Sequence, residues 1–165
     1  MFETPILFLI FNRPDTTKQT FEAISRQKPR YLYIAADGPR KNNADDIELC
    51  KATRAVVSQI DWDCQVKTLY RYKNLGCGAA PAQAITWFFQ NVEQGIILED
   101  DICTDPSFFT FCETMLNYHK NDDRIMHISG CYFLDDWLKT PGKQSYHRTK
   151  HIHVWGWATW RRAWK

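Results

Sequence analysis

The sequence predicts a three-layer α/β domain with a mostly parallel sheet, and three features of the chain support that prediction. Short apolar runs typical of strands alternate with longer segments in which apolar residues recur at helical spacing. The first run, residues 6–11, is apolar without a break, as expected for a strand that helices cover on both faces. Polar turns directly follow the runs, beginning with residues 12–15. Alternation of this kind favours parallel strands joined by helical crossovers.

The first half of the chain contains three pairs of strand and helix. Strands are expected at residues 6–11, 31–36 and 66–70, and a helix follows each of them. The first helix carries Phe21 and Ile24 on one side. Asn43 is suited to cap the second helix. Along one side of that helix are spaced Ile47, Cys50, Arg54, Val57 and Ile60. The third helix follows a glycine-containing loop and passes through Trp87 and Phe88.

The second half adds two strands, at residues 95–98 and 125–129, with a helix between them that starts at Asp105 and Pro106. Residues 131–150 are irregular and polar. The final eleven residues contain four tryptophans, a cluster that needs a surface to cover it. We therefore expect one domain over residues 1–165, apparently truncated at its C-terminus.

Composition and charge limit the classes of function. With 44% hydrophobic and 24% charged residues, the chain is composed like a soluble globular protein. Its net charge is +2, but residues 139–165 carry seven Lys or Arg and no acid, after fourteen basic and nineteen acidic side chains. The basic end either meets an anionic ligand or surface, or is a solvated tail. We expect no nucleic-acid partner.

The six cysteines lie at irregular intervals without a CxxC pair, which excludes the common zinc and thioredoxin-like spacings. We expect reduced thiols that mostly fill core space. The apolar run at residues 5–11 is too short to span a bilayer and has no basic region before it. The sequence therefore predicts a cytoplasmic protein without a transmembrane segment, for which peripheral membrane contact stays open.

The acidic triplet Glu99, Asp100 and Asp101 directly follows the apolar strand at residues 95–98. In an open α/β sheet, ligands collect outside the carboxyl ends of the strands. Three adjacent carboxylates repel one another and call for a cation or an unusual protonation state. Mg²⁺ and Mn²⁺ prefer such oxygen ligands, and Mg²⁺ typically takes one or two carboxylates together with substrate phosphates. The alternative is an idle, solvated acidic loop.

This segment, GIILEDDICTDPSFF at residues 95–109, resembles the metal-binding segment of GT-A-fold glycosyltransferases. The likeness is to the N-acetylglucosaminyltransferase I type and to related bacterial sugar transferases. Residues 5–15, 34–38 and 155–164 match in the same order, so the resemblance spans essentially the whole chain. It implies a GT-A sandwich whose donor-binding core is residues 1–130, with residues 131–165 as the incomplete start of an acceptor-side segment.

The resemblance implies a metal-dependent transferase that moves a sugar from a nucleotide-diphosphate donor, expected to be a UDP-sugar, to a hydroxyl acceptor such as a growing glycan. Asn12 and Arg13 match positions that meet the base and the diphosphate. Asp37 matches the carboxylate that reads the base, expected to be uracil. Chemically this is coherent, because a guanidinium fork suits phosphate and a divalent cation neutralises the departing diphosphate.

In the same comparison Asp101 matches the ligand of Mn²⁺ or Mg²⁺, and Glu99 and Asp100 match positions that face the donor sugar and ribose. The loop at residues 73–78 edges the donor pocket in the resembled family, which makes Lys73 a candidate phosphate contact. It is not a dinucleotide fingerprint, because Pro81 occupies the third glycine position.

The catalytic base is the missing part. In the resembled family it follows the segment that matches residues 155–164, so we expect it beyond Lys165, with Asp135 and Asp136 as weak substitutes. The main alternative is therefore a truncated, non-catalytic nucleotide-sugar-binding module. His151 and His153 have strand spacing for a second metal site, but two surface histidines fit better because no third ligand is evident.

Two other classes fit the sequence poorly. A sugar nucleotidyltransferase needs a glycine-rich loop after its first strand, and residues 11–14 contain no glycine. A receiver-type signalling domain needs acidic residues there, where Asn12 and Arg13 stand.

Overall fold

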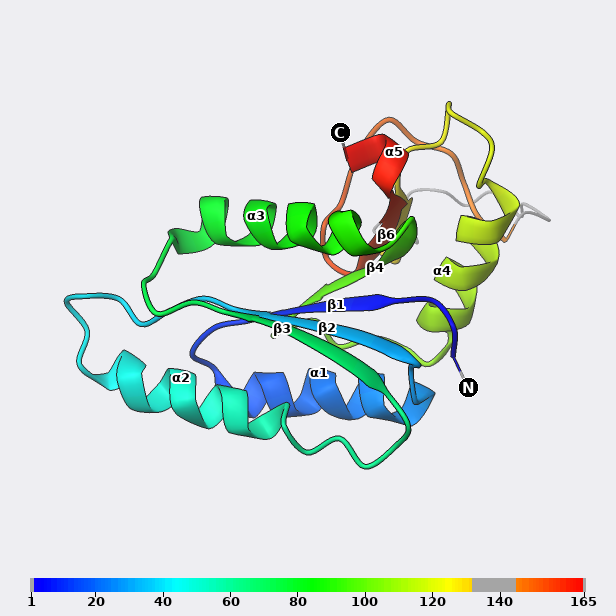
Figure 1. Cartoon of the computed structure of the whole chain (residues 1–165). Coiled ribbons are helices and arrows are strands. Elements are labelled where there is room, and N and C mark those ends of the chain that lie inside the picture. Colours follow the sequence, from blue (N-terminus) through cyan, green and yellow to red (C-terminus); the bar gives the residue numbers. More distant parts are fainter. Residues whose placement is uncertain (1, 132–144, 165) are drawn as a thin grey trace, which may run out of the picture.

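A computed structural model describes residues 2–131 and 145–164 and confirms the predicted class, a three-layer α/β/α domain (Figure 1). Six strands form one sheet in the order β3-β2-β1-β4-β6-β5. Four of them are parallel: β1 (Ile6–Ile10), β2 (Tyr31–Ala36), β3 (Gln65–Tyr70) and β4 (Gln94–Glu99). The sheet is completed by β5 (Ile128–Ser129) and β6 (Trp157–Trp160), and β6 runs antiparallel to β4 and β5.

The strand order reverses beside β1. Ile6 lies opposite Leu32 of β2 on one side and opposite Ile96 of β4 on the other. From β1 the chain first winds outward through β2 and β3, and then returns to place β4 on the other side. In doubly wound sheets, such a reversal opens a crevice at the carboxyl ends of the two central strands. The topology therefore places a ligand crevice between the ends of β1 and β4.

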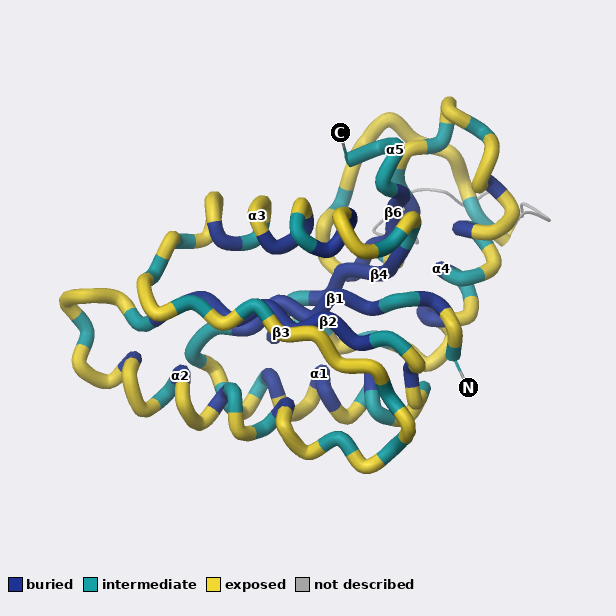
Figure 2. The backbone as a smooth tube through the Cα atoms, in the orientation of Figure 1, coloured by how far each residue is buried: buried dark blue, intermediate teal, exposed yellow. Residues whose placement is uncertain are grey.

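Helices cover both faces of the sheet. One face packs against α1 (Pro14–Gln27), α2 (Asp45–Val56) and α4 (Ser107–Tyr118). The other packs against α3 (Gly76–Asn91) and the short α5 (Arg161–Trp164). Figure 2 shows the central strands buried and the outer sides of the helices exposed. This double cover explains why the central strands are continuous apolar runs without alternation.

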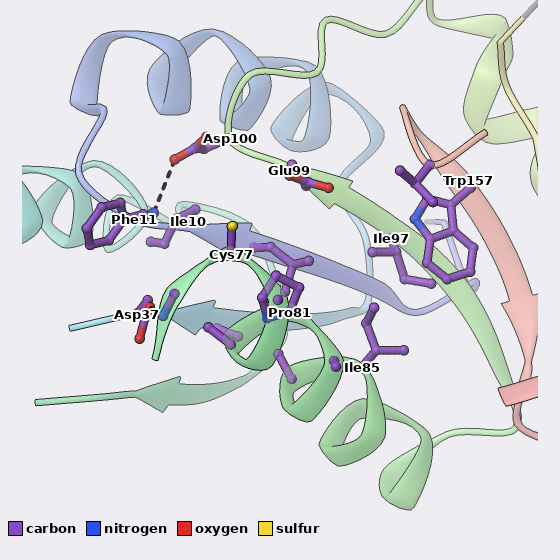
Figure 3. A pocket seen from close by; sticks show the side chains of 18 of the residues that line it. Ile10, Phe11, Asp37, Cys77, Pro81, Ile85, Ile97, Glu99, Asp100 and Trp157 are labelled. Carbon is purple, nitrogen blue, oxygen red and sulfur yellow. Dashed lines mark hydrogen bonds between the residues drawn. The ribbon is translucent and has the colours of Figure 1, made fainter. Parts of the chain in front are cut away.

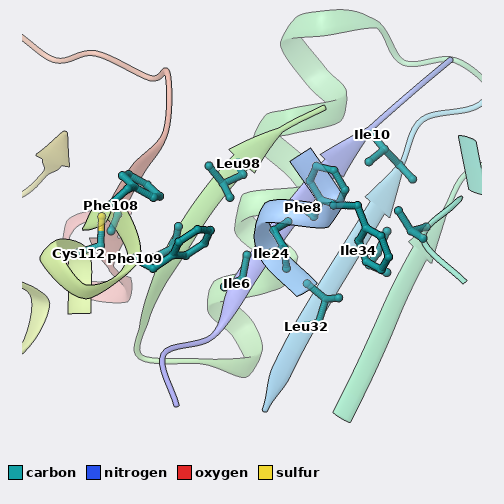
Figure 4. Packing of buried hydrophobic residues seen from close by; sticks show 14 of the residues in the cluster. Ile6, Phe8, Ile10, Ile24, Leu32, Ile34, Leu98, Phe108, Phe109 and Cys112 are labelled. Atoms are coloured by element: carbon teal, nitrogen blue, oxygen red, sulfur yellow. The ribbon is translucent and has the colours of Figure 1, made fainter. Parts of the chain in front are cut away.

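Alternate residues of β1 divide the core into two clusters. Ile6 and Phe8 point to the face of α1 and α4, where Phe8, Ile24 and Phe109 have no exposed surface (Figure 4). Leu7 and Leu9 point to the opposite face and pack against α3. Because successive side chains of a strand point to opposite faces, β1 contributes to the hydrophobic core on both sides of the sheet.

Several predicted boundaries were displaced. The boundary at α2 agrees with the prediction, because Asn43 Oδ1 accepts the N–H of Asp45, the first residue of the helix, at 3.2 Å and so caps its start. Ile47 is 60% exposed and does not belong to the buried side of α2. The predicted strand at residues 125–129 shortens to two residues in β5. The start of α4 lies one residue later than predicted, with Asp105 Oδ1 accepting from the Ser107 N–H at 2.8 Å.

The tryptophan-rich end forms β6, a strand that the sequence analysis did not predict. Trp157 and Trp160 are buried in the sheet, and Trp160 Nε1 donates to the Leu116 carbonyl of α4 at 3.2 Å. The expectation that the whole cluster needs an outside surface was therefore wrong, although Trp155 is 57% exposed.

The cysteine prediction holds only in part. All six thiols are free, but only Cys50 and Cys112 are buried, whereas Cys77 and Cys103 are exposed. No helix in the two described ranges is long and apolar enough to cross a membrane.

Candidate functional site

The acidic triplet forms the turn that ends β4. Glu99 is the last residue of the strand and lies opposite Leu9 in β1. Asp100 is buried, and its Oδ2 accepts the Phe11 N–H at 3.1 Å, which ties the ends of β1 and β4 together (Figure 3). Thr20 of α1 donates its hydroxyl to the Asp100 carbonyl at 3.3 Å. The turn is therefore fixed from both the sheet and the helix layer.

Arg13 reaches this turn from the other side of the crevice. Its Nη1 lies 2.7 Å from Asp101 Oδ2 and 3.5 Å from Asp100 Oδ1. The Arg13 and Asp101 side chains are both about half exposed, at 57% and 46%. The guanidinium thus supplies the positive charge that adjacent carboxylates call for, at a position that solvent and ligands can reach.

The surroundings favour the neutral forms of two of the carboxyls. Burial raises the pKa of Glu99, and the neighbouring Asp101 and Asp100 raise it further. Burial likewise raises the pKa of Asp100, although the Phe11 N–H bond and Arg13 act against this. An approaching cation would relieve both effects, because positive charge favours the ionised carboxylate.

Asp37 follows β2 and holds the loop that leads into α3. Its two carboxylate oxygens accept the Leu75 N–H at 3.1 and 3.0 Å, and Oδ2 also accepts from Gly76 N–H and Asn74 Nδ2. Gly76 has a φ of +80°, in the left-handed region that glycine adopts without strain. The base contact predicted for Asp37 stays a prediction, and a ligand would compete there with these loop bonds.

Asn12 does not line the crevice. Its amide donates to Asp46 Oδ1 of α2 at 2.8 Å. The same buried carboxylate receives the Arg40 guanidinium at 2.6 Å, and this contact holds the pKa of Asp46 well below its usual range. Arg40 in turn lies over the Phe11 ring at 5.5 Å. Asn12 therefore positions Asp46 and Arg40, an indirect role that its place after β1 did not indicate.

A cavity of about 860 Å³ opens where these elements meet, within the size range of small-molecule and cofactor sites. Its floor is the sheet, and the first turns of α3 with Cys77, Pro81 and Ile85 form one wall (Figure 3). Glu99 lies between the end of β1 and Trp157 of β6. One end of the cavity is therefore charged and the other is apolar and aromatic.

Of the residues predicted for the site, four line the cavity: Arg13, Asp37, Glu99 and Asp100. Asp101 lies beside it through its contact with Arg13. Asn12 and Lys73 are not among the lining residues. The Lys73 backbone instead packs against Gly38, where an added Cβ would come within 2.5 Å of the Lys73 nitrogen.

Three lining residues with charge or proton-transfer chemistry were not predicted from the sequence: Arg40, Arg71 and His127. Arg40 follows the Asp37 turn and Arg71 follows β3, so both lie just past the carboxyl end of a strand. This position after a strand is the sequence feature that could have identified Arg40 and Arg71 as candidate site residues. Within the described part of the chain the Arg71 guanidinium has no acidic partner, whereas Arg13 and Arg40 each pair with aspartate.

The two weak candidates for a base, Asp135 and Asp136, lie outside the described residues. In the part of the chain that the structure describes, no group of three or more His, Cys, Asp or Glu side chains could hold a metal ion, and this includes His151 and His153.

Fold and site together define a doubly wound α/β protein with a charged pocket at the switch point of its sheet. No protein-family model matches the chain, and a search of curated proteins gave no match. Among solved structures, the chain is similar to 4-diphosphocytidyl-2C-methyl-D-erythritolsynthase from Anaerococcus prevotii DSM 20548. The identity is 11% and the TM-score 0.47, over 96% of this chain and 72% of that one.

Proposed function

We propose that the chain is a GT-A-type glycosyltransferase that binds a nucleotide-diphosphate sugar, taken as a UDP-sugar, in the switch-point pocket. The sugar passes to a hydroxyl acceptor such as a glycan, with help from a divalent cation. The observation that carries the proposal is the meeting of Arg13, Arg40 and Arg71 with Glu99 and Asp100 in one cavity at the ends of β1 and β4.

The arginines suit the diphosphate. Guanidinium groups form bidentate hydrogen bonds with phosphate oxygens, and they stay charged at any physiological pH. Arg71 lines the cavity without an acidic partner among the described residues, so it is free to neutralise an anionic ligand. The N-terminal turn of α3, which includes Gly78, adds the positive end of a helix dipole to the same wall.

The carboxylates at the end of β4 suit a divalent cation that is bound partly by the protein and partly by the phosphates of the ligand. Asp101 offers a half-exposed carboxylate, and Asp100 lies within 3.5 Å of the same guanidinium. A Mg²⁺ or Mn²⁺ that takes one or two carboxylates and completes its shell with phosphates and water needs no cage of three protein ligands. When bound, such a cation neutralises charge that develops on the departing diphosphate.

The residues that line the pocket have separate roles in this proposal. Arg13 exchanges Asp101 for a phosphate oxygen, so its charge stays at the site while its partner changes. Glu99 faces the cavity between the charged end and Trp157, a position from which its carboxyl can bind sugar hydroxyls. The apolar wall of α3 and the Trp157 indole reduce access of water to the reacting bond, and aromatic faces suit the C–H surfaces of sugars.

Thermal unfolding with a panel of ligands tests this proposal. Ligand at a hundred times its dissociation constant stabilises a folded protein by about 2.7 kcal/mol. We expect a clear rise in Tm with UDP or a UDP-sugar and Mn²⁺, and a smaller rise for Arg71→Gln. The control Arg26→Gln, at an exposed position in the last turn of α1, should respond like the wild type.

The same panel separates the alternatives. A larger rise with CTP or UTP than with any UDP-sugar would favour a nucleotidyltransferase. Binding of UDP-sugar without any transfer to mixed acceptors or to water would favour the non-catalytic module. No response to any nucleotide would refute the proposal.

A further inference from the structure

His127 lines the pocket and directly precedes β5. Its imidazole stacks on the Trp157 indole, with ring centroids 4.9 Å apart and an angle of 18° between the planes. Trp157 lies opposite Ile97 of β4 in the sheet. Ile97 comes two residues before Glu99 on that strand, so Trp157 and Glu99 lie on the same face of the sheet. His127 and Glu99 both line the cavity, so the ring borders the same space as the carboxyl proposed to bind the donor sugar.

One hydrogen bond fixes the tautomer of this ring. His127 Nε2 lies 2.9 Å from the backbone carbonyl oxygen of His153. A carbonyl only accepts, so Nε2 carries the proton, and in the neutral imidazole Nδ1 then holds a lone pair. Among the described residues Nδ1 has no hydrogen-bond partner, and the atom keeps some exposed surface. Its lone pair is therefore accessible.

The neutral form is also the favoured form. Burial lowers the pKa of His127, with a smaller opposing effect from the bond to the His153 carbonyl and a further lowering from the His153 charge. A stacked, oriented and neutral imidazole with a free Nδ1 has the properties of a general base.

We propose that His127 is the general base that deprotonates the acceptor hydroxyl, an inference that rests on the sugar transfer proposed above. The hydroxyl proton moves to Nδ1 as the acceptor oxygen bonds to the anomeric carbon of the donor. The bond from that carbon to the diphosphate oxygen breaks, and its electron pair leaves with the nucleotide diphosphate. The imidazolium later releases its proton to water. A direct displacement of this kind inverts the anomeric configuration.

The variant His127→Gln tests the inference, because the glutamine amide can still donate to the His153 carbonyl but cannot accept a proton at neutral pH. The assay is release of UDP from a panel of UDP-sugars with Mn²⁺, with water and mixed oligosaccharides as acceptors. Removal of a general base typically costs 10²–10⁴-fold in rate, so we expect at least a hundredfold loss. The Kd for UDP should change less than twofold. The control His151→Gln removes an exposed imidazole nearby and should keep the wild-type rate.

The pH profile separates a base from a packing residue. The wild-type rate should fall below neutral pH as His127 takes up a proton, and the residual rate of His127→Gln should lack that limb. A ¹⁵N spectrum of the wild-type histidines should show His127 protonated at Nε2.

Unchanged turnover in His127→Gln would overturn the inference while leaving the donor site intact. A wild-type chain that binds the donor without turning it over, even to water, would overturn it as well. Failure of the wild type to bind any UDP-sugar would instead refute the proposed function itself.

Discussion

Replacing Arg13 by glutamine should change the affinities for metal and nucleotide in opposite directions. Arg13 and a divalent cation compete for the Asp101 carboxylate, which the guanidinium approaches to 2.7 Å. Because both side chains are about half exposed, the ion pair contributes at most about 1 kcal/mol. Its loss should therefore raise the affinity of the free protein for Mn²⁺ by up to about fivefold. No side chain caps α1 at Arg13, so the helix start should survive the change.

The nucleotide should respond the other way. A hydrogen bond to a charged group is worth about 1.5–3 kcal/mol, and partial exposure favours the lower end of that range. We expect the affinity for UDP at saturating Mn²⁺ to fall by about tenfold. Mn²⁺ binding is followed by electron paramagnetic resonance and UDP binding by calorimetry.

The matched control is Arg30→Gln, which removes an arginine of similar exposure that pairs with Glu3 at 3.5 Å, at the opposite end of the strands from the pocket. Both affinities should stay at the wild-type values. If Arg13→Gln weakens Mn²⁺ binding, or leaves UDP binding unchanged, the exchange of partners proposed for Arg13 is wrong.

Asp101→Asn keeps the size of the side chain and should weaken Mn²⁺-dependent UDP binding at least tenfold, about 1.4 kcal/mol, with the circular dichroism spectrum unchanged; full binding would mean that another carboxylate holds the cation or that none does. Gly95→Ala should lower Tm by about 6 °C, from about 2 kcal/mol of overpacking against the Phe88 ring, whereas Gly78→Ala meets no atom within 4 Å and should not lower it; equal shifts would contradict the packing described. Because the pKa of Asp46 is depressed in the folded protein, its ion pair stabilises the fold above the ordinary aspartate pKa of about 4, and this stabilisation is lost below it. The free energy of unfolding of Asp46→Asn should therefore fall less steeply in acid than that of the wild type. Identical acid titrations of the two proteins would show that the ion pair does not contribute.

The parallel half of the sheet could be predicted because its information is local. Each central strand is a continuous apolar run followed by a polar turn, and both faces are buried, so periodicity and position agree. β6 could not be predicted in this way. It is an antiparallel strand with adjacent buried residues, built from tryptophans and small residues, and its partner β4 lies about sixty positions earlier in the chain.

The candidate site was predictable only where a residue lies at or shortly after the end of a strand and faces the crevice. Arg13, Glu99 and Asp100 meet that condition and line the pocket. Asn12 has the same sequence position but turns to Asp46, since its direction depends on a helix thirty residues away. Whether a side chain after a strand faces the ligand or the helix layer is a tertiary property.

The charged partners of the site show the same limit. Arg40 and Arg71 reach the cavity from the ends of two different strands, and only the assembled sheet brings them together. His127 directly precedes β5, a short edge strand whose place in the sheet depends on β6. These residues carry the proposals on phosphate binding and on the base, although no local motif marks them.

Calorimetry of UDP binding with and without metal tests the central claim most directly. The wild-type chain is titrated with UDP and with UDP-sugars in Mn²⁺, and then again after EDTA treatment. We predict saturable binding at one site with Mn²⁺ and at least a tenfold loss of affinity when the metal is removed. Equal affinity in both conditions, or no binding in either, would contradict a metal-assisted nucleotide-sugar site at the end of β4.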